Sequence, residues 1–261
     1  MGSLLGNQLL TLDESEVSIK WKELSDDMKL VINKQEYTLS HNKPKEIELY
    51  HFLSEDDKIN FLQDVLTNPK KYESLNLINS QNESLIYLVC ADNKEDIALK
   101  LIKFDFIKKL IGIPNNKNDN VLSWACYHCM EKLVSTLFKS HLESIEKFIN
   151  LIDRKGWSLL HWVCYKKSTN IALLLIPYTD ISIISSLNYN RESPLYWACY
   201  NSLPDICYLL ISIMKNNNKY KSILHTSDIY GYTPLYWSSK NNLTDVVELL
   251  TLLDVGLKKE V

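Results

Sequence analysis

The sequence predicts an all-α protein, organised as a solenoid of about six stacked helix–turn–helix repeats. One short stretch recurs along the 261 residues, clearly at 153–164, 188–199 and 228–239 and more weakly at 84–90 and 120–126. Self-similarity at this period is typical of arrays in which each repeat packs on its neighbours. The chain has only 6 glycines and 7 prolines, which disfavours an all-β fold rich in tight turns.

Each copy of the stretch begins like a helix. A side chain that can cap a first helical turn precedes each one, namely Ser84, Asn120, Ser158, Ser193 and Thr233. Pro194 and Pro234 follow two of these caps, at the first helical position, where proline loses no hydrogen bond. An apolar residue and, three positions later, a small or slim one complete the pattern, so that one face of each helix can approach a neighbour closely.

The pattern resembles the ankyrin repeat, whose signature is a turn with Asp and Gly followed by Thr-Pro-Leu-His-x-Ala. The clearest copy is Asp228-Ile-Tyr-Gly-Tyr-Thr-Pro-Leu-Tyr-Trp-Ser-Ser239. Only His161 keeps the family's histidine, and only Gly156 and Gly231 keep the turn glycine. Successive copies are 36, 38, 35 and 40 residues apart, against about 33 in the family. We therefore expect small insertions in the loops.

Three regions follow along the chain. Residues 1–45 do not follow the repeat and should form an N-terminal arm that is disordered, a small hairpin or a cap over the first repeat; residues 17–22 and 30–39 suit short strands. Residues 46–255 should form the repeat array. It would begin with a degenerate helix pair over 46–70, in which Ser54 caps the second helix. Residues 256–261 should form a C-terminal tail.

Second helices are predicted in the five complete repeats from their apolar periodicity. They lie around Ile97–Ile102, Leu133–Phe138, Ile171–Ile176, Ile206–Ile213 and Val246–Leu253. Pro177 should stop the third of them. An amphipathic stretch from Leu142 to Ile152 and a polar insertion from Lys215 to Ser222 should occupy two of the longer connections.

The composition, charge and motifs of the sequence exclude several classes of function. A net charge of −3 lacks the excess of basic residues that sequence-independent nucleic-acid binding needs. No apolar run is long enough for a transmembrane helix. The six cysteines fit free thiols in a reducing compartment, so we expect a cytoplasmic protein. No nucleophile, P-loop or dinucleotide-binding motif is present, and we therefore predict neither an enzyme nor a cofactor.

Two cysteine motifs suggest zinc, but the expected geometry opposes it. They are Cys126-Tyr-His-Cys129 and His161-Trp-Val-Cys164. Equivalent helices in adjacent repeats lie about 8–10 Å apart, whereas zinc ligands lie within about 2.3 Å of the metal. Disulfides between equivalent cysteines fail for the same reason. We predict no metal site.

The most distinctive feature is aromatic. Trp124, Trp162, Trp197 and Trp237 share one repeat position, and tyrosine follows three of them at i+3. In a helix these side chains should face away from the second helix, which the family resemblance equates with the concave, partner-binding side. The predicted partner-binding residues are Tyr127, His128, Trp157, Trp162, Tyr165, Lys166, Trp197, Tyr200, Tyr230 and Tyr232.

Two interpretations of these rings remain open, namely packing between helices and exposure for partner binding. The tryptophans can pack between adjacent first helices, which we favour for most of their surface because large aromatic side chains are mostly buried. We expect Tyr165, Tyr200 and Trp157, by contrast, to be exposed.

The resemblance implies a non-catalytic adaptor that binds a protein or peptide in the concave groove. One alternative is a membrane-tethered scaffold, acylated at Gly2, although the usual motif has Ser or Thr where this chain has Gly6. A single acyl chain would be a weak tether. Another alternative is the targeting subunit of an enzyme carried on a separate chain.

Overall fold

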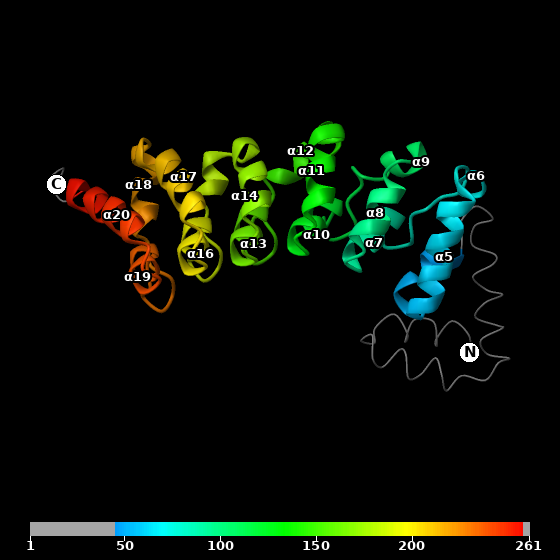
Figure 1. Ribbon diagram of the computed structural model, residues 1–261, viewed down its shortest axis with the longest axis horizontal. Helices are drawn as coiled ribbons and strands as arrows, with labels where there is room; N and C mark the ends of the chain where they lie inside the picture. Colours follow the sequence, from blue (N-terminus) through cyan, green and yellow to red (C-terminus); the bar gives the residue numbers. More distant parts are fainter. Residues whose placement is uncertain (1–44, 258–261) are drawn as a thin grey trace. The chain divides into compact units, whose positions relative to one another are not determined.

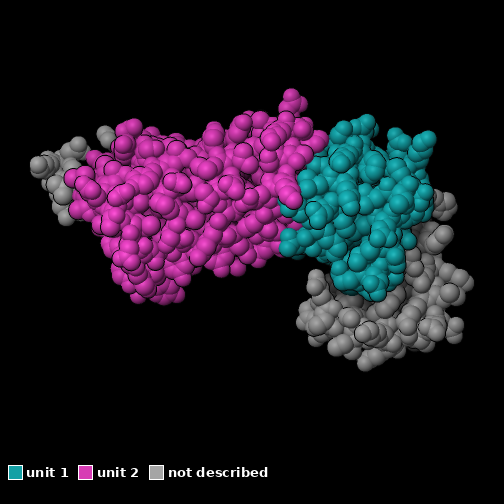
Figure 2. Space-filling model, viewed as in Figure 1, with its two compact units in different colours: residues 1–119 teal, residues 120–261 magenta. Residues whose placement is uncertain are grey.

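The computed structural model describes residues 45–257 (Figure 1). Gly2, the two predicted strands and all but Lys45 of the predicted arm lie outside the described residues, as do residues 258–261 of the predicted tail. The chain divides into two compact units, residues 1–119 and 120–261 (Figure 2). Each unit is described by itself below.

The described part of the chain is helical and contains no strand; its only β features are two isolated bridges, Ile78–Ser84 and Ile152–Ser158. The first unit contains α4 (Lys45–Glu48), η1 (Tyr50–Phe52), α5 (Glu55–Thr67), α6 (Pro69–Tyr72), α7 (Leu85–Ala91), α8 (Glu95–Leu101) and α9 (Asp105–Lys108). The second contains α10 (Val121–Tyr127), α11 (Glu131–Ser140), α12 (Leu142–Ile149), α13 (Leu159–Tyr165), α14 (Thr169–Leu175), η2 (Ile176–Tyr178), α15 (Ile181–Ile184), α16 (Pro194–Tyr200), α17 (Pro204–Lys215), α18 (Asn218–Lys221), η3 (Ser222–His225), α19 (Pro234–Lys240) and α20 (Thr244–Leu257). The predicted fold class, an all-α solenoid of repeats, is confirmed.

The five predicted first helices are α7, α10, α13, α16 and α19. Each begins one residue after its predicted cap, and in each the cap side chain accepts a hydrogen bond from the third helical N–H. Ser54 caps α5 in the same way. The predicted caps are therefore confirmed.

The five predicted second helices are α8, α11, α14, α17 and α20. Each begins two residues before its first predicted apolar residue. The added residues are polar or proline, such as Glu95 and Glu131. A negative side chain there favours the helix N-terminus, but apolar periodicity does not detect it. Pro177 lies in η2, directly after α14 ends at Leu175.

A short third helix follows the second helix in every repeat that has another repeat after it. α6, α9, α12, α15 and α18 occupy this place, and each repeat is consequently longer than a helix pair needs. The predicted amphipathic stretch is α12, the longest of them, which buries Ile145, Phe148 and Ile149. The predicted polar insertion before the last repeat is likewise helical, as α18 and η3. The expected insertions are therefore present, but they form short helices, which were not predicted from the sequence.

The turn before each first helix is built on one side chain, Asn79, Asn115, Asp153, Asn188 or Asp228. Its Oδ1 accepts hydrogen bonds from the backbone N–H groups two and four residues later, at 2.8–3.0 Å. Neighbouring turns are joined by single backbone bonds, such as Tyr189 N to Lys155 O and Ile229 N to Asn190 O, both 3.0 Å long. These bonds hold the three turns of the second unit, at 153–157, 188–192 and 228–232, in register.

Left-handed backbone conformations occur at two positions of the repeat. The first is in the turn, at Asn82, Asn118, Gly156, Arg191 and Gly231. The second follows each first helix, at Asn93, Cys129, Lys167, Ser202 and Asn242. The two turn glycines found in the sequence are therefore members of a set whose other members are not glycine.

In the second unit the helices form two rows. α10, α13, α16 and α19 contact one another in series, and α11, α14, α17 and α20 do the same (Figure 1). The core includes the buried side chains of Leu122, Ala125, Leu160 and Val163 in the first row and of Leu133 in the second. The outer face of the first-helix row is left for the aromatic side chains.

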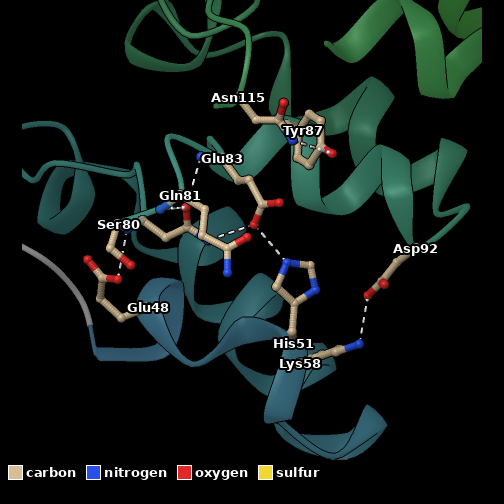
Figure 3. Close-up of polar contacts among 10 residues, drawn as sticks. Glu48, His51, Lys58, Ser80, Gln81, Glu83, Tyr87, Asp92 and Asn115 are labelled. Atoms are coloured by element: carbon tan, nitrogen blue, oxygen red, sulfur yellow. Dashed lines mark hydrogen bonds and ion pairs between the residues drawn. The ribbon is translucent and has the colours of Figure 1, made fainter. Parts of the chain in front are cut away.

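In the first unit, the elements before α7 dock through polar contacts (Figure 3). His51 Nε2 lies 2.7 Å from Glu83 Oε2, and Lys58 Nζ lies 3.0 Å from Asp92 Oδ2. The carboxylate of Glu48 accepts from the N–H of Ser80 at 2.9 Å. These contacts fix α4, η1 and α5 against the first complete repeat.

Candidate functional site

The aromatic side chains of the second unit form one continuous row across four first helices. We call Trp124, Tyr127, Trp162, Tyr165, Trp197, Tyr200 and Trp237 the aromatic row. Within it each tyrosine meets the tryptophan of the next helix: the ring centroids are 5.2 Å apart for Tyr127–Trp162, 4.9 Å for Tyr165–Trp197 and 4.6 Å for Tyr200–Trp237. The planes cross at 72–78°. Such edge-to-face pairs add about 0.5–1.5 kcal/mol each beyond the area they bury.

The rings of the aromatic row differ in exposure, and Tyr127 is half-buried. Tyr165 and Tyr200 are 41% and 42% exposed, as expected. The four tryptophans are half-buried, so they pack between adjacent first helices and also leave an edge at the surface. The tryptophans therefore contribute to the packing between helices, and part of each ring is also accessible at the surface.

Trp157 differs from the expectation of exposure, because it is half-buried. It precedes the helix cap Ser158, and its ring stacks on Trp162 with centroids 4.3 Å apart. It also lies 5.4 Å from Trp197. The turn thus folds over the aromatic row and places Trp157 between two repeats.

The turn before α19 presents further exposed rings. Tyr230 is 76% exposed and Tyr232 39%. Tyr232 joins the aromatic row through Trp237, at 5.5 Å between centroids. Tyr189, in the preceding turn, is 77% exposed.

Tyr236 is an exposed ring that sequence reasoning missed. It occupies the family's histidine position, where Tyr196 is buried and donates to Asp228 Oδ2 at 2.8 Å in the following turn. Tyr236 is 43% exposed and packs on Tyr232. Tyr196 is covered by the turn that follows it. The sequence has no further copy of this turn after α19, and this was the signal that Tyr236 would be exposed.

Two lysines lie over the aromatic rings. Lys166 Nζ lies 4.3 Å from the ring centroid of Tyr127 and 5.8 Å from that of Tyr165, so it bridges two repeats. Lys240 takes the place of the tyrosine in α19, and its Nζ lies 4.8 Å above Trp237. His128 stacks on Trp124 at 5.5 Å. Cation–π contacts of this kind favour the ammonium positions by about 0.5–1 kcal/mol at exposed sites.

The ends of the first helices are held together by asparagines. Asn201 Nδ2 donates to the carbonyls of Cys164 and Tyr165, at 3.0 and 2.8 Å. Asn241 Nδ2 donates to those of Cys199 and Tyr200, at 2.9 and 2.8 Å. Each bond satisfies a carbonyl at a helix C-terminus, and together they fix the positions of Tyr165 and Tyr200.

His161, the one histidine at the family position, has a structural role. Its Nδ1 accepts from the N–H of Ser158 at 3.1 Å, and its Nε2 donates to the carbonyl of Glu192 at 3.1 Å. Burial lowers the pKa of His161 to about 4. The neutral ring therefore links α13 to the next turn.

The cysteines are free thiols, and five of the six are buried. Desolvation raises the pKa of Cys90, Cys126 and Cys164, so these thiols are not reactive groups. Cys199 and Cys207 lie 3.6 Å apart, sulfur to sulfur. No group of three or more His, Cys, Asp or Glu side chains within residues 45–257 is placed to hold a metal ion.

The fold and the aromatic row define a protein of the helical repeat class. A comparison with family models finds two overlapping matches: residues 139–221 and 184–259 match the model described as ankyrin repeats (3 copies). Residues 139–259 are therefore ankyrin repeats. No curated protein matches the chain. In the part that the structure describes, no helix has both the length and the apolar character to cross a membrane.

Proposed function

We propose that this protein is a non-catalytic adaptor that binds a protein or peptide on the aromatic row and the turns beside it. Ankyrin repeats are generally protein–protein interaction modules, and we assign the predicted partner-binding groove to the face that carries the row. One observation supports this most: Tyr165 and Tyr200 remain exposed in a surface whose other rings are packed and held in place. Rigid, partly exposed aromatic side chains are typical of binding hot spots.

The charges of the same face agree with a binding role. The first helices α10, α13, α16 and α19 contain no acidic residue, and their one charged residue is Lys240. Tyr127, His128, Trp162, Lys166, Trp197, Tyr230 and Tyr232 complete the proposed surface, with Trp157 beneath it. A cytoplasmic location, predicted from the free thiols, belongs to the same proposal.

The test is affinity capture from an extract of the source cells, with Tyr165→Ala and Tyr200→Ala combined. The matched control replaces two exposed tyrosines outside the row, Tyr178→Ala and Tyr208→Ala. Both double variants should keep the helical circular dichroism of the parent. We expect the first to lose its specific partners and the second to keep them. Equal partner sets for both variants would show that the row is not the binding surface.

A further inference from the structure

The spacing of the tyrosines in the aromatic row gives information about the shape of the partner. Tyr127, Tyr165 and Tyr200 end successive first helices, and packed helices lie about 8–10 Å apart. A polyproline II chain repeats every three residues, or about 9.3 Å. A β-strand presents one face about every 6.7 Å. A polyproline II segment that runs along the row therefore meets each repeat with the same side.

The hydrogen-bonding groups of the row select against a helical partner. Tyr165 and Tyr200 are exposed, and their hydroxyl groups have no hydrogen bond within residues 45–257. They can donate to acceptors that lie one repeat apart. The carbonyls of a polyproline II segment are free to accept, whereas those of an α-helix are used within the helix.

The charge of the face indicates what the segment carries. Lys166 and Lys240 form no ion pair within the described part of the chain, and both ammonium groups lie against rings of the row or its neighbours. Lys166 directly follows α13 and Lys240 ends α19, and these two helices are two repeats apart, or about 16–20 Å. Six residues of polyproline II cover about 18.6 Å. Two carboxylates six residues apart in such a segment can therefore reach the two lysines.

We propose that the partner is a proline-rich, acidic segment of another protein, bound along the aromatic row in the polyproline II conformation. The prolines pack against Tyr165, Tyr200 and Trp237, and the tyrosine hydroxyls donate to the carbonyls of the segment. Acidic side chains pair with Lys166 and Lys240. This inference rests on the proposed function, because it names the occupant of the same surface.

The test is a titration of the full chain with synthetic peptides, followed by tryptophan fluorescence and by calorimetry. The probe is a proline-rich peptide with two aspartates six positions apart. One comparison peptide has asparagine for both aspartates, a second has glycine for the prolines, and a third is a helix-forming peptide of the same charge. We expect the probe to bind most tightly. Loss of the charges should weaken binding about tenfold, the scale of two exposed ion pairs. Loss of the prolines should also weaken binding, because the glycine peptide must lose more conformational freedom.

The variants of the chain test the same geometry. Lys166→Gln combined with Lys240→Gln should weaken binding of the acidic probe about tenfold and leave the asparagine peptide unaffected. Lys215→Gln, an exposed lysine of α17, is the control and should change neither. A glycine peptide that binds as well as the probe, a helical peptide that binds better, or no binding of the probe would each overturn the inference. In those cases the capture experiment above still decides the proposed function.

Discussion

At the scale of single residues, the strongest constraint is the neutral ring of His161. Its two nitrogens have fixed roles: Nδ1 accepts from the N–H of Ser158, and Nε2 donates to the carbonyl of Glu192. If Nδ1 were protonated, it would face the N–H of Ser158 and could no longer accept a hydrogen bond from it. Burial lowers the pKa of His161 from 6.5 to about 4, and it outweighs the bond to the Glu192 carbonyl, which acts in the opposite direction.

We therefore expect a loss of stability in mild acid that depends on His161. Between pH 6.5 and about 4 the unfolded chain binds a proton at this residue and the folded chain does not. The free energy of unfolding should consequently fall as the pH is lowered through this range, by up to about 3 kcal/mol from this residue. Urea unfolding at several pH values, for the parent and for His161→Gln, measures the difference. An identical pH dependence in the two proteins would contradict the assignment.

The two turn glycines offer a second test at this scale. Gly156 and Gly231 both have positive φ, of 79° and 89°, but an added Cβ would lie 3.0 Å from the Cα of Asn188 at Gly156 and would meet nothing within 4 Å at Gly231. Gly231→Ala should cost about 1–2 kcal/mol from the left-handed backbone alone. Gly156→Ala should cost more, because the neighbouring turn must also move. Thermal unfolding of the two variants decides this, and equal losses would show that the turns are free to separate.

The same positions show why the sequence revealed only part of the turn. Gly156 and Gly231 are visible as the family's glycines, but Arg191 adopts φ 62° in the same place. An arginine gives no signal for this conformation. Its position becomes recognisable only once the side chain three residues before it, Asn188, is seen to accept two backbone hydrogen bonds.

At the scale of elements, the tyrosines of first helices have two different tasks. Tyr196 is buried and donates to Asp228, whose other carboxylate oxygen accepts from the N–H groups of Tyr230 and Tyr232. Tyr200, one turn later in α16, is exposed, and its hydroxyl has no partner within residues 45–257. One residue connects a helix to the next turn, and the other is available to a ligand.

This difference predicts opposite results for two identical substitutions. Tyr196→Phe should lower the free energy of unfolding by about 1–3 kcal/mol, because it leaves a buried carboxylate oxygen without its donor. Tyr200→Phe should leave stability unchanged. Chemical denaturation followed by circular dichroism compares the two. If Tyr200→Phe were the more damaging change, the roles assigned to these hydroxyls would be wrong.

The elements also separate what the sequence could predict from what it could not. Caps such as Ser193 are local signals, since the side chain bonds within its own first turn. The short third helices are not: α15, over Ile181–Ile184, has no side-chain cap and buries only Ile184. Its helical form depends on packing against α17, which lies farther along the chain. The aromatic row is an intermediate case. The positions of its residues follow from the repeat, but the exposure of each ring depends on the neighbouring turn.

At the scale of the whole molecule, stability should follow the order of the repeats. In a solenoid each repeat is stabilised by its neighbours on either side. α16 contacts both α13 and α19, and α17 contacts α14 and α20, whereas the main contacts of α20 are with α19, α17 and η3, which all precede it. Leu252 of α20 is 63% exposed, which shows that one face of this helix has no cover within the described residues.

Amide hydrogen exchange in the free chain should therefore slow from α20 toward α16. Opening of α20 breaks one interface between repeats, whereas opening of α16 breaks two, so exchange of α16 requires a larger free energy. Mass spectrometry of exchange at a series of times measures this for peptides within each helix. Saturation with the proline-rich acidic peptide should extend the slow region to α19, because Trp237 and Lys240 would then be held by the ligand. Protection of α20 equal to that of α16 in the free chain would mean that the second unit opens as a single cooperative body.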